Sequence, residues 1–552
     1  MNAVIGQASR VAAQASHRLA AAVAAVTLCG LPWAAPPSAA AAPSASNAPV
    51  APAPRTGPGE AEADYAAHCA ACHGVQRLGG SGPALLPSNL ARLSRKAAAD
   101  VIRQGRIATQ MPGFDAVLTP ARIAALVEHV YSSPPTPPTW SAGNLAASRV
   151  VHVDAATLPP RPVHRADPLN LFVVVETGDH HVSIVDGDRF EPIARFPSRF
   201  ALHGGPKFSP DGRFVYFASR DGWISKYDLW SLQLVVEVRA GLNTRNAAVS
   251  SDGRYVAVGN YLPHTLVVLD ARDLSSVKIL GVTDGRGRSS RVSAVYDARS
   301  RRSFVVALKD VAEIWEVSYD DAAPPFYQGL VHDYRMGEGI ATPAKLNPRR
   351  IVLDEVLDDF FFAPGHAYVI GAARDSGSGQ VVNLDVRRRI ASVPLPGLPH
   401  LASGISWRRD GATVMATPNL REGVVSVIDV ATWREIARIA TPGPGFFLRS
   451  HQQSRYAFVD SMAGPAKDTL TVIDKASLEV VARLRPEPGK AVGHIEFTRD
   501  GRFAVASLWE NDGALIVYDA ATLEEVRRLP MRKPVGKYNV HNKISRSEGT
   551  SH

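Results

Sequence analysis

The sequence is poor in cysteine and in long apolar runs. Three cysteines among 552 residues are too few for a disulfide-stapled scaffold. Only one apolar run, near the start, approaches membrane-spanning length, which excludes a polytopic membrane protein. The excess of base is modest, 61 Lys+Arg against 52 Asp+Glu, and no arginine-lysine run suggests nucleic-acid binding. The remaining composition, 45% hydrophobic and 20% charged with 43 Gly and 41 Pro, indicates a globular fold with many turns.

The first 42 residues resemble a targeting segment. They contain no acid and two strong bases, Arg10 and Arg18. An apolar stretch from Leu19 to Leu31 follows, and then the small-residue run Ser38–Ala42. A basic region, a short apolar core and a small-residue cleavage zone are typical of a secretory signal peptide. We therefore predict a signal peptide over 1–42 and a periplasmic mature chain without an integral membrane span, with an uncleaved N-terminal anchor as the alternative.

The other two cysteines lie together in Cys69-Ala-Ala-Cys72-His73. This C-x-x-C-H spacing is the attachment motif of c-type haem, in which two thiols form thioether bonds and the histidine ligates the iron. A redox dithiol lacks a neighbouring βαβ pattern here, and a zinc site lacks a second C-x-x-C pair. The motif predicts a covalent haem c in an all-α cytochrome c domain over 55–132.

A methionine after the motif is the candidate for the second axial ligand. Met111 lies in Met111-Pro112-Gly113-Phe114, ahead of a helix predicted over about 120–131 from the helical spacing of its apolar residues. Small c-type cytochromes resemble this layout, with the distal methionine in a loop before the last helix. The resemblance implies Met111 as the sixth iron ligand, and the alternative is a core side chain that fills a gap.

A proline-rich linker over 133–165, expected to be stiff and extended, precedes a repetitive region over 166–552. There a β-rich run ends repeatedly in a hydrophobic residue and aspartate, at intervals of roughly 42 to 45 residues. The markers are Asp186, Asp228, Asp270, Asp385, Asp429, Asp474 and Asp519, with a degenerate copy at Ile314–Val317. This period predicts the blades of a β-propeller.

A second recurring motif supports the propeller. Asp-Gly pairs between apolar residues, as in Asp211-Gly212, Asp252-Gly253, Asp410-Gly411 and Asp500-Gly501, indicate β-hairpins. Eight markers predict a mainly β, eight-bladed β-propeller, with seven blades as the alternative because the interval from 270 to 385 is irregular. Propellers bind ligands at the mouth of the central channel, but the fold alone does not name the ligand.

The combination of a c-type haem domain and an eight-bladed propeller resembles the cytochrome cd1 nitrite reductases and their relatives in haem d1 biosynthesis. The resemblance covers nearly the whole mature chain. Its most specific pieces are Ala201–Gly205, Ala218–Trp223, Asn243–Asn246, Asn260–His264 and Gly536–Val540. In this family the propeller holds haem d1, a carboxylate-rich tetrapyrrole, non-covalently over the channel.

The residues agree with such a ligand. Neutral imidazole is a good iron ligand, and His203 precedes two glycines that would let a large flat ligand approach the backbone. Arg220 and Arg245 fall at similar positions of their blades and would clamp carboxylates. The resemblance adds Tyr261 to the binding residues. The alternatives are a satisfied histidine at a strand end and two arginines in surface or inter-blade salt bridges.

Two positions decide which family member the chain resembles. Nitrite reductases of the family have two distal histidines, whereas this chain has Asp358 where the first would lie and His400 at the second. The intact C-x-x-C-H motif then favours the biosynthetic member that dehydrogenates dihydro-haem d1, oxidising a propionate side chain to acrylate in the last step of haem d1 synthesis. The alternatives are a nitrite reductase with an altered distal face and a non-catalytic haem d1 carrier.

The resemblance to this dehydrogenase implies roles for three residues. His400 lies near or on the iron as an axial candidate beside His203, and His494 and Tyr538 take part in catalysis. The alternative is a buried strand histidine and a tyrosine that closes the last blade. Electrons would leave through haem c to an external periplasmic redox protein, and nitrite reductase is a candidate recipient of the product. The adjacent His180 and His181 are interpreted as turn or surface residues.

Overall fold

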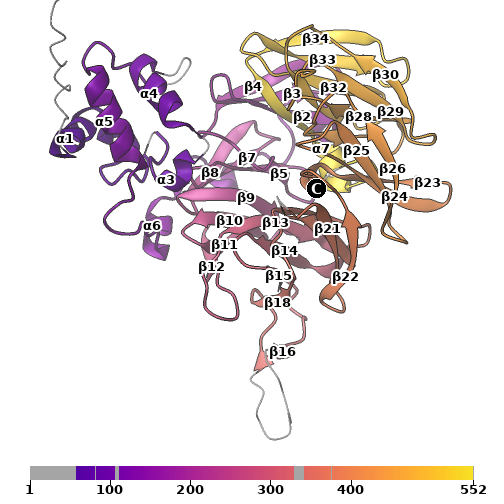
Figure 1. The fold of residues 1–552 in the computed structure, drawn as a ribbon, viewed down its shortest axis with the longest axis horizontal. Helices are drawn as coiled ribbons and strands as arrows, with labels where there is room; N and C mark the ends of the chain where they lie inside the picture. Colours follow the sequence, from indigo (N-terminus) through magenta and orange to yellow (C-terminus); the bar gives the residue numbers. More distant parts are fainter. Residues whose placement is uncertain are drawn as a thin grey trace, which may run out of the picture. The chain divides into compact units, whose positions relative to one another are not determined.

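The computed structural model describes residues 58–80, 82–91, 93–105, 111–327, 341–373 and 376–550. The predicted signal peptide lies outside these residues. Helices of the described part are short, and none is long and apolar enough to cross a membrane. Two kinds of structure follow each other along the chain, a helical domain and a set of four-stranded sheets (Figure 1).

The helical domain is small and encloses a hollow. Its helices are α1 (Pro58–His68), α2 (Ala70–His73), α3 (Pro87–Leu90), α4 (Arg95–Gln104) and α5 (Pro120–Tyr131). The predicted last helix is confirmed as α5, which begins at Pro120 after the N-cap Thr119 and buries one apolar face, including Ile123 and Leu126. An ion pair between Arg122 and Asp64 joins α5 to α1.

The linker differs from its prediction in one part. A connector that is extended throughout was expected, yet Ala142–Ala147 form helix α6. Ser141 caps this helix, and Leu145 on it is buried against the propeller. Strand β1 (Val150–Val151) then pairs with β8, so the linker is attached to the second blade. A capping box and one buried leucine were enough to override the proline-rich composition.

The propeller has eight four-stranded blades in the described residues, which confirms the predicted count. Blade 1 contains β35 (Pro534–Asn539), β2 (Leu171–Glu176), β3 (His181–Asp186) and β4 (Glu191–Pro197). Blade 2 contains β5 (Lys207–Phe208), β6 (Phe214–Ala218), β7 (Trp223–Asp228) and β8 (Gln233–Arg239). Blade 3 contains β9 (Asn243–Val249), β10 (Tyr255–Leu262), β11 (Thr265–Asp270) and β12 (Ser276–Gly281). Blade 4 contains β13 (Val292–Ala298), β14 (Ser303–Leu308), β15 (Glu313–Ser318) and β18 (Pro348–Val352).

The second half of the ring repeats this order. Blade 5 contains β19 (Asp359–Phe362), β20 (Tyr368–Ala372), β21 (Ser378–Asn383) and β22 (Arg388–Pro394). Blade 6 contains β23 (Ile405–Arg409), β24 (Ala412–Pro418), β25 (Val424–Asp429) and β26 (Arg434–Ala440). Blade 7 contains β27 (Leu448–Arg449), β28 (Tyr456–Asp460), β29 (Leu470–Asp474) and β30 (Val480–Leu484). Blade 8 contains β31 (Val492–Phe497), β32 (Phe503–Leu508), β33 (Gly513–Asp519) and β34 (Glu525–Met531).

An irregularity in blade 4 explains the long interval in the repeat. Strands β16 (Phe326–Tyr327) and β17 (Ala341–Thr342) form a separate two-stranded extension between β15 and β18. Figure 1 shows this extension projecting from the blade. Insertion into one blade lengthens the spacing without removing a blade, so the seven-bladed alternative is wrong.

The aspartate markers recur because they cap a turn. At the end of the third strand, Asp186 accepts hydrogen bonds from the backbone N–H groups of Asp188 (2.8 Å) and Arg189 (3.2 Å). Asp474 and Asp519 do the same in blades 7 and 8. In blade 5 the predicted marker was wrong by two residues, because Asn383 rather than Asp385 caps the turn.

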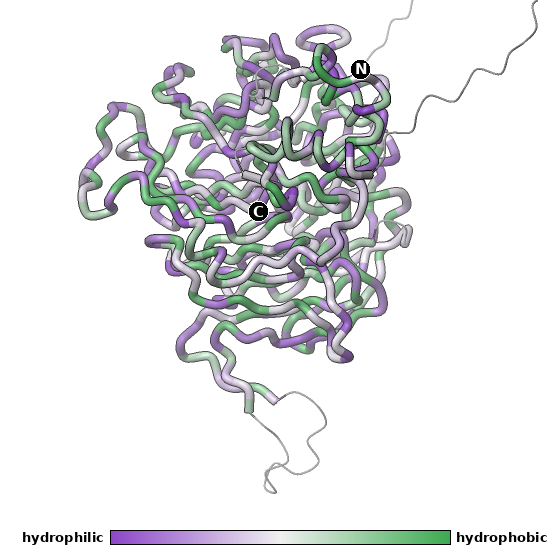
Figure 2. Tube along the Cα trace, turned by 90° about the vertical axis from the view of Figure 1, so that its left-hand side faces the viewer, coloured by the Kyte–Doolittle hydropathy of each residue, from purple (hydrophilic) through white to green (hydrophobic). Residues whose placement is uncertain are grey.

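Apolar residues fill the spaces between adjacent blades. Strand β2 is buried throughout, whereas the outer strand β4 is largely exposed or half-buried. Figure 2 shows the hydrophobic segments within the stacked strands and hydrophilic residues at the turns. The inner strands therefore meet around a central channel, whose mouth is available for polar side chains.

The ring closes through residues far apart in the chain. Strand β35 pairs antiparallel with β2, with Val173 opposite Tyr538 and Val174 opposite Lys537. Tyr538 was expected to close the last blade, and it lies instead on the strand that completes the first one. Helix α7 (Val540–Ser545) follows, and Asn542 donates hydrogen bonds to Glu496 (3.1 Å) and to the carbonyl of Phe497 (2.9 Å) in blade 8.

Candidate functional site

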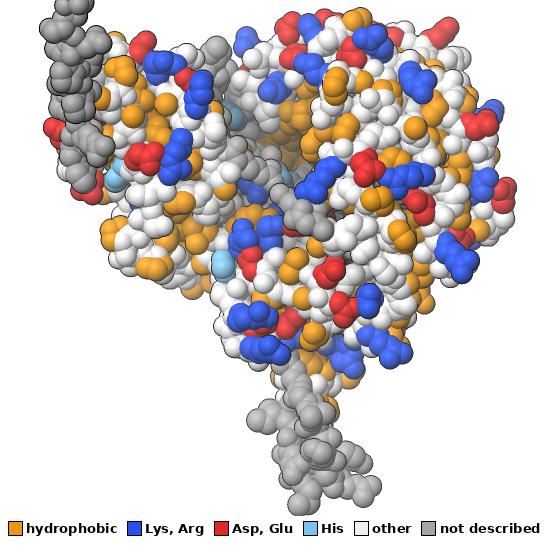
Figure 3. Space-filling model, viewed as in Figure 1, with side chains coloured by type: hydrophobic (Ala, Val, Ile, Leu, Met, Phe, Trp, Pro, Cys, Tyr) orange, Lys and Arg blue, Asp and Glu red, His pale blue; other side chains and the backbone are white. Residues whose placement is uncertain are grey.

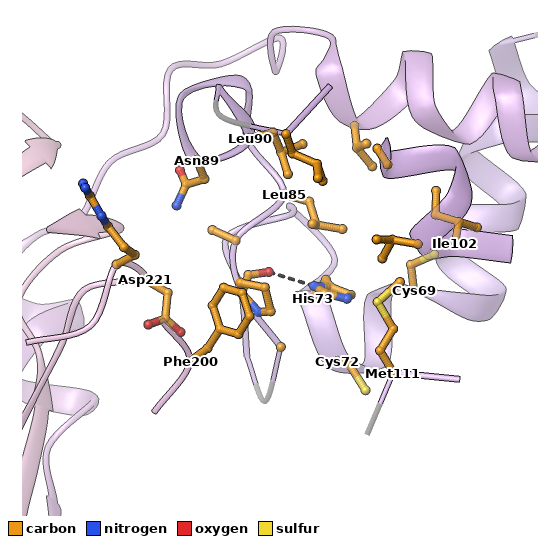
Figure 4. A pocket seen from close by; sticks show the side chains of 18 of the residues that line it. Cys69, Cys72, His73, Leu85, Asn89, Leu90, Ile102, Met111, Phe200 and Asp221 are labelled. Atoms are coloured by element: carbon orange, nitrogen blue, oxygen red, sulfur yellow. Dashed lines mark hydrogen bonds between the residues drawn. The ribbon is translucent and has the colours of Figure 1, made fainter. Parts of the chain in front are cut away.

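The helical domain contains a cavity of about 870 Å³ around the C-x-x-C-H motif. Helix α2 places Cys69, Cys72 and His73 along one wall, because the N–H groups of both Cys72 and His73 bond to the carbonyl of Cys69. Met111 lines the same cavity, and Figure 4 shows it on the side of the two cysteines. The cavity volume fits a haem, and its lining offers two thiols for covalent attachment and a histidine and a methionine as iron ligands.

His73 is held as an iron ligand requires. Its Nδ1 lies 2.7 Å from the carbonyl oxygen of Pro83, and since a carbonyl only accepts, Nδ1 carries the proton and donates. The lone pair is then on Nε2, which is the arrangement usual for metal-ligating histidines. Burial lowers the pKa of His73, which keeps the ring neutral. A Cβ at Gly82 would lie 2.8 Å from the ring, so glycine is required there.

Propeller residues complete the wall of this cavity. Phe200, Arg220 and Asp221 contribute to it, as do His180 and His181. His180 lies in a turn, as interpreted, whereas His181 begins β3, and both line this cavity rather than only the surface. His180 adopts a positive φ of 56° in the turn before β3 and its ring lies 5.2 Å from that of Phe200, so the alternation of strand side chains does not apply.

A second group of site residues lies on the propeller. His203 precedes β5, and its Nδ1 lies 2.7 Å from the carbonyl oxygen of Arg245. Nδ1 therefore donates, and Nε2 holds the lone pair, to which Arg220 Nη2 donates at 2.8 Å. His400 precedes the 3-10 turn Leu401–Ser403, and its Nδ1 likewise donates to a carbonyl, that of Phe446. Burial lowers the pKa of His400. In His73, His203 and His400 alike, Nδ1 donates to a backbone carbonyl and leaves the lone pair on Nε2.

The two predicted clamp arginines do not occupy similar positions, which corrects the prediction. Arg220 lies in the loop between β6 and β7, whereas Arg245 is on the inner strand β9. Arg245 forms an ion pair with Asp359 at 3.2 Å, and the Tyr296 hydroxyl donates to the same carboxylate at 3.0 Å. The guanidinium of Arg220 lies 5.9 Å from the ring centre of Tyr261.

The glycines after His203 are needed for contacts within the chain. Gly204 and Gly205 have φ values of +82° and +68°. A Cβ at Gly204 would lie 2.6 Å from Cβ of Asn246, and one at Gly205 would lie 3.0 Å from the Tyr538 ring. We expected the two glycines to let a ligand approach the backbone. The structure shows instead that they leave room for the side chains of Asn246 and Tyr538.

His494 and Tyr538 lie side by side, although they come from blades 8 and 1. Their ring centres are 4.9 Å apart at an angle of 68°. His494 is 1% exposed, and burial followed by the charge of Lys537 lowers its pKa well below the usual value. Burial raises the pKa of Tyr538 to about 12. Near neutral pH the histidine is therefore uncharged and the tyrosine keeps its proton.

Three charged residues were missed by the sequence analysis. Arg449 on β27 is 4% exposed, and its charge acts on His400, His494 and Tyr538. Lys537 is fully buried, and Lys309 forms an ion pair with Asp358. No local motif marks Arg449 or Lys309, and Lys537 lies in the segment Gly536–Val540 without a predicted role of its own. Figure 3 shows basic side chains around the hollow of the propeller face.

These groups fit an anionic tetrapyrrole. His203 and His400 carry a lone pair on Nε2, which in His203 accepts a hydrogen bond from Arg220, and arginines from three blades lie near the two histidines. The channel mouth is thus suited to a flat, iron-bearing ligand with carboxylates. Asp358, predicted to stand where a nitrite reductase would have a histidine, forms an ion pair with Lys309.

Comparisons with known proteins agree with both domains. Residues 166–331 and 340–543 match the family described as "Cytochrome D1 heme domain", and residues 58–130 match "Cytochrome C oxidase, cbb3-type, subunit III". The chain is 57% identical over 498 residues to the "Dihydro-heme d1 dehydrogenase" of Pseudomonas aeruginosa, covering 90% of this chain and 97% of that protein. It is 24% identical over 538 residues to the "Nitrite reductase" of Stutzerimonas stutzeri, covering 87% and 92%.

A solved structure supports the same relationship. The structure titled "Dihydro-heme d1 dehydrogenase NirN in complex with DHE" is similar with a TM-score of 0.83 and 57% sequence identity. The similarity covers 88% of this chain and all of that one.

Proposed function

The chain belongs to the family of the cytochrome D1 heme domain, and from that premise we propose that it is a periplasmic dihydro-haem d1 dehydrogenase. The reaction converts a –CH2–CH2–COO⁻ side chain of the bound tetrapyrrole into –CH=CH–COO⁻. Two protons and two electrons are released. The acrylate product is haem d1.

The helical domain provides the exit for electrons. Cys69 and Cys72 would hold haem c, and His73 and Met111 would ligate its iron. Bound there, haem c would supply a one-electron acceptor, and an external periplasmic redox protein would take the electrons onward. Nδ1 of His73 donates to the Pro83 carbonyl, which orients the ring toward the cavity.

The propeller residues bind and orient the substrate. His203 and His400 are the candidate axial ligands, because each has Nδ1 committed to a carbonyl and the lone pair on Nε2. This hydrogen-bond pattern, in which Nδ1 donates to a carbonyl and Nε2 keeps the lone pair, is the observation that supports the proposed function. Arg220, Arg245 and Tyr261 bind carboxylates and the edge of the ring. His494 and Tyr538, packed against each other, act on the side chain that is oxidised.

The decisive experiment incubates the purified holoprotein with dihydro-haem d1 without oxygen and records absorption spectra. We expect conversion to haem d1 together with reduction of haem c, resolved by their separate bands. Absence of conversion by the wild type would contradict the proposal, as would full activity of a His494→Ala/Tyr538→Phe double variant. Tight binding and transfer of unchanged tetrapyrrole would instead support a carrier, and nitrite turnover would support a nitrite reductase.

A further inference from the structure

His494 is held in the opposite way from the three histidines suited to bind iron. The backbone N–H of Lys537 donates to its Nδ1 at 3.4 Å. This contact favours the neutral tautomer with the proton on Nε2. The low pKa of His494 agrees with a neutral ring. His494 presents an N–H group, whereas His73, His203 and His400 present a lone pair.

The backbone at this position is fixed by the same lysine. His494 has a φ of 50°, in a bulge where the pairing of β31 with β32 shifts between Gly493 and Glu496. The side-chain nitrogen of Lys537, which is fully buried, donates to the carbonyl of His494 and to Ser507 Oγ at 3.0 Å. Two contacts from Lys537 thus hold His494, one at its ring and one at its carbonyl, and the contact with Ser507 fixes the lysine side chain.

The polar tips of His494 and Tyr538 are available for a ligand. Among the residues that the structure describes, neither Nε2 of His494 nor the hydroxyl of Tyr538 has a hydrogen-bond partner, although His494 is 1% exposed. Neither atom is among the fully buried polar atoms without a partner, so both are accessible to an acceptor that binds beside them.

A buried cation lies near this pair. Arg449 is 4% exposed and donates to the carbonyls of Leu448 (2.7 Å) and Ser403 (3.4 Å). Its buried Nε has no partner in the described part of the chain. Two donors and a cation favour an anionic acceptor with more than one oxygen.

We propose that His494 Nε2–H, the Tyr538 hydroxyl and Arg449 form a subsite for a substrate carboxylate, and that Lys537 positions His494 as the donor. This proposal rests on the proposed function and assigns the carboxylate to the side chain that is oxidised. Donors to that carboxylate stabilise the negative charge that spreads onto it when the adjacent carbon loses a proton to a water molecule. The two electrons of the oxidation pass one at a time to haem c. His494 does not itself accept that proton at Nε2.

Alanine substitution does not separate a donor from a base. Removing one donor to a developing oxyanion costs about 10²–10³-fold in rate. Removing a general base costs about 10²–10⁴-fold, which overlaps. Glutamine separates the two roles, because its side-chain amide donates hydrogen bonds but takes up no proton near neutral pH.

The test compares His494→Gln with His494→Ala in single-turnover conversion of dihydro-haem d1, with substrate affinity measured by absorbance titration. We expect His494→Gln to retain at least about ten times the rate of His494→Ala. Equal losses in the two variants, with an active wild type, overturn the proposal. An inactive wild type would contradict the proposed function instead. The haem c spectrum and the thermal midpoint serve as folding controls.

A second measurement tests the ligand class. Wild type, Arg449→Met and Tyr538→Phe are titrated with dihydro-haem d1 and with its methyl ester, which lacks ionised carboxylates. We expect both variants to weaken binding of the acid more than binding of the ester. An unchanged ratio of the two affinities in both variants overturns the subsite.

The positioning role of Lys537 is tested by a double-mutant cycle. Lys537→Met should slow conversion in the wild-type background and have little further effect in the His494→Ala background. Equal slowing in both backgrounds would indicate a merely structural role and contradict positioning through His494.

Discussion

Replacing Gly205 by alanine tests whether the place of Tyr538 controls the reaction. Gly205 has a φ of +68°, and the added Cβ would lie 3.0 Å from the Tyr538 ring and 3.2 Å from its hydroxyl. The left-handed backbone costs an alanine about 1–2 kcal/mol, and the ring has to move in addition. Such a contact requires the Tyr538 ring to shift by only a fraction of an ångström, and because misplacement by about 1 Å costs up to about 10²-fold in rate, we expect Gly205→Ala to slow conversion by about threefold or more.

Gly411 provides the matched control. It has a φ of +80° in the hairpin between β23 and β24, and no heavy atom lies within 4 Å of the added Cβ. Gly411→Ala should therefore cost the same 1–2 kcal/mol or so of backbone strain and leave turnover unchanged.

The assay combines denaturant unfolding with single-turnover conversion of dihydro-haem d1. Similar losses of unfolding free energy in the two variants, with slow conversion only in Gly205→Ala, are the expected result. Unimpaired conversion by Gly205→Ala would refute the reasoning, since the Tyr538 ring cannot keep its place beside an alanine at 205.

Three further predictions concern ligation and pH. His203→Ala or His400→Ala should alter the absorption and EPR spectra of bound haem d1, whereas His494→Ala should leave them unchanged. A spectral change in His494→Ala alone would contradict ligation of the iron by His203 and His400. Met111→Ala should lower the midpoint potential of haem c in a redox titration, and an unchanged potential would exclude Met111 as ligand. Burial raises the pKa of Asp460 to about 6. The folded state therefore holds a proton that the unfolded state releases, so stability falls as pH rises from about 4 to 6. Asp460→Asn should remove this part of the pH dependence of unfolding, and an identical profile would contradict it.

Local patterns predicted what local interactions determine. The C-x-x-C-H motif forms one helical turn, so its spacing alone orders two thiols and a histidine. The aspartate markers repeat because each caps a turn within a few residues, as Asp186 does for Asp188 and Arg189. Such contacts are visible in the sequence because their partners are close in it.

The channel residues depend on contacts between distant segments. Arg245 was predicted as a carboxylate clamp, but its ion pair with Asp359 joins blades 3 and 5 and no spacing indicates it. Arg449 lies in a two-residue strand without a motif. Its significance appears only when blade 7 faces the strand that carries Tyr538. The resemblance to the family proposed roles for His494 and Tyr538, whereas the preferred tautomer of His494 depends on its contact with Lys537.

The pairing of β35 with β2 has a consequence for how the molecule matures. Residues 534–539 bring Lys537 and Tyr538 to His494, so an intermediate with an open ring lacks this part of the pocket. Formation of the pocket and completion of the first blade are one event. Molecules in which β35 has not paired with β2 therefore cannot bind the tetrapyrrole through His494 and Tyr538. Oxidation of the bound tetrapyrrole requires the closed propeller.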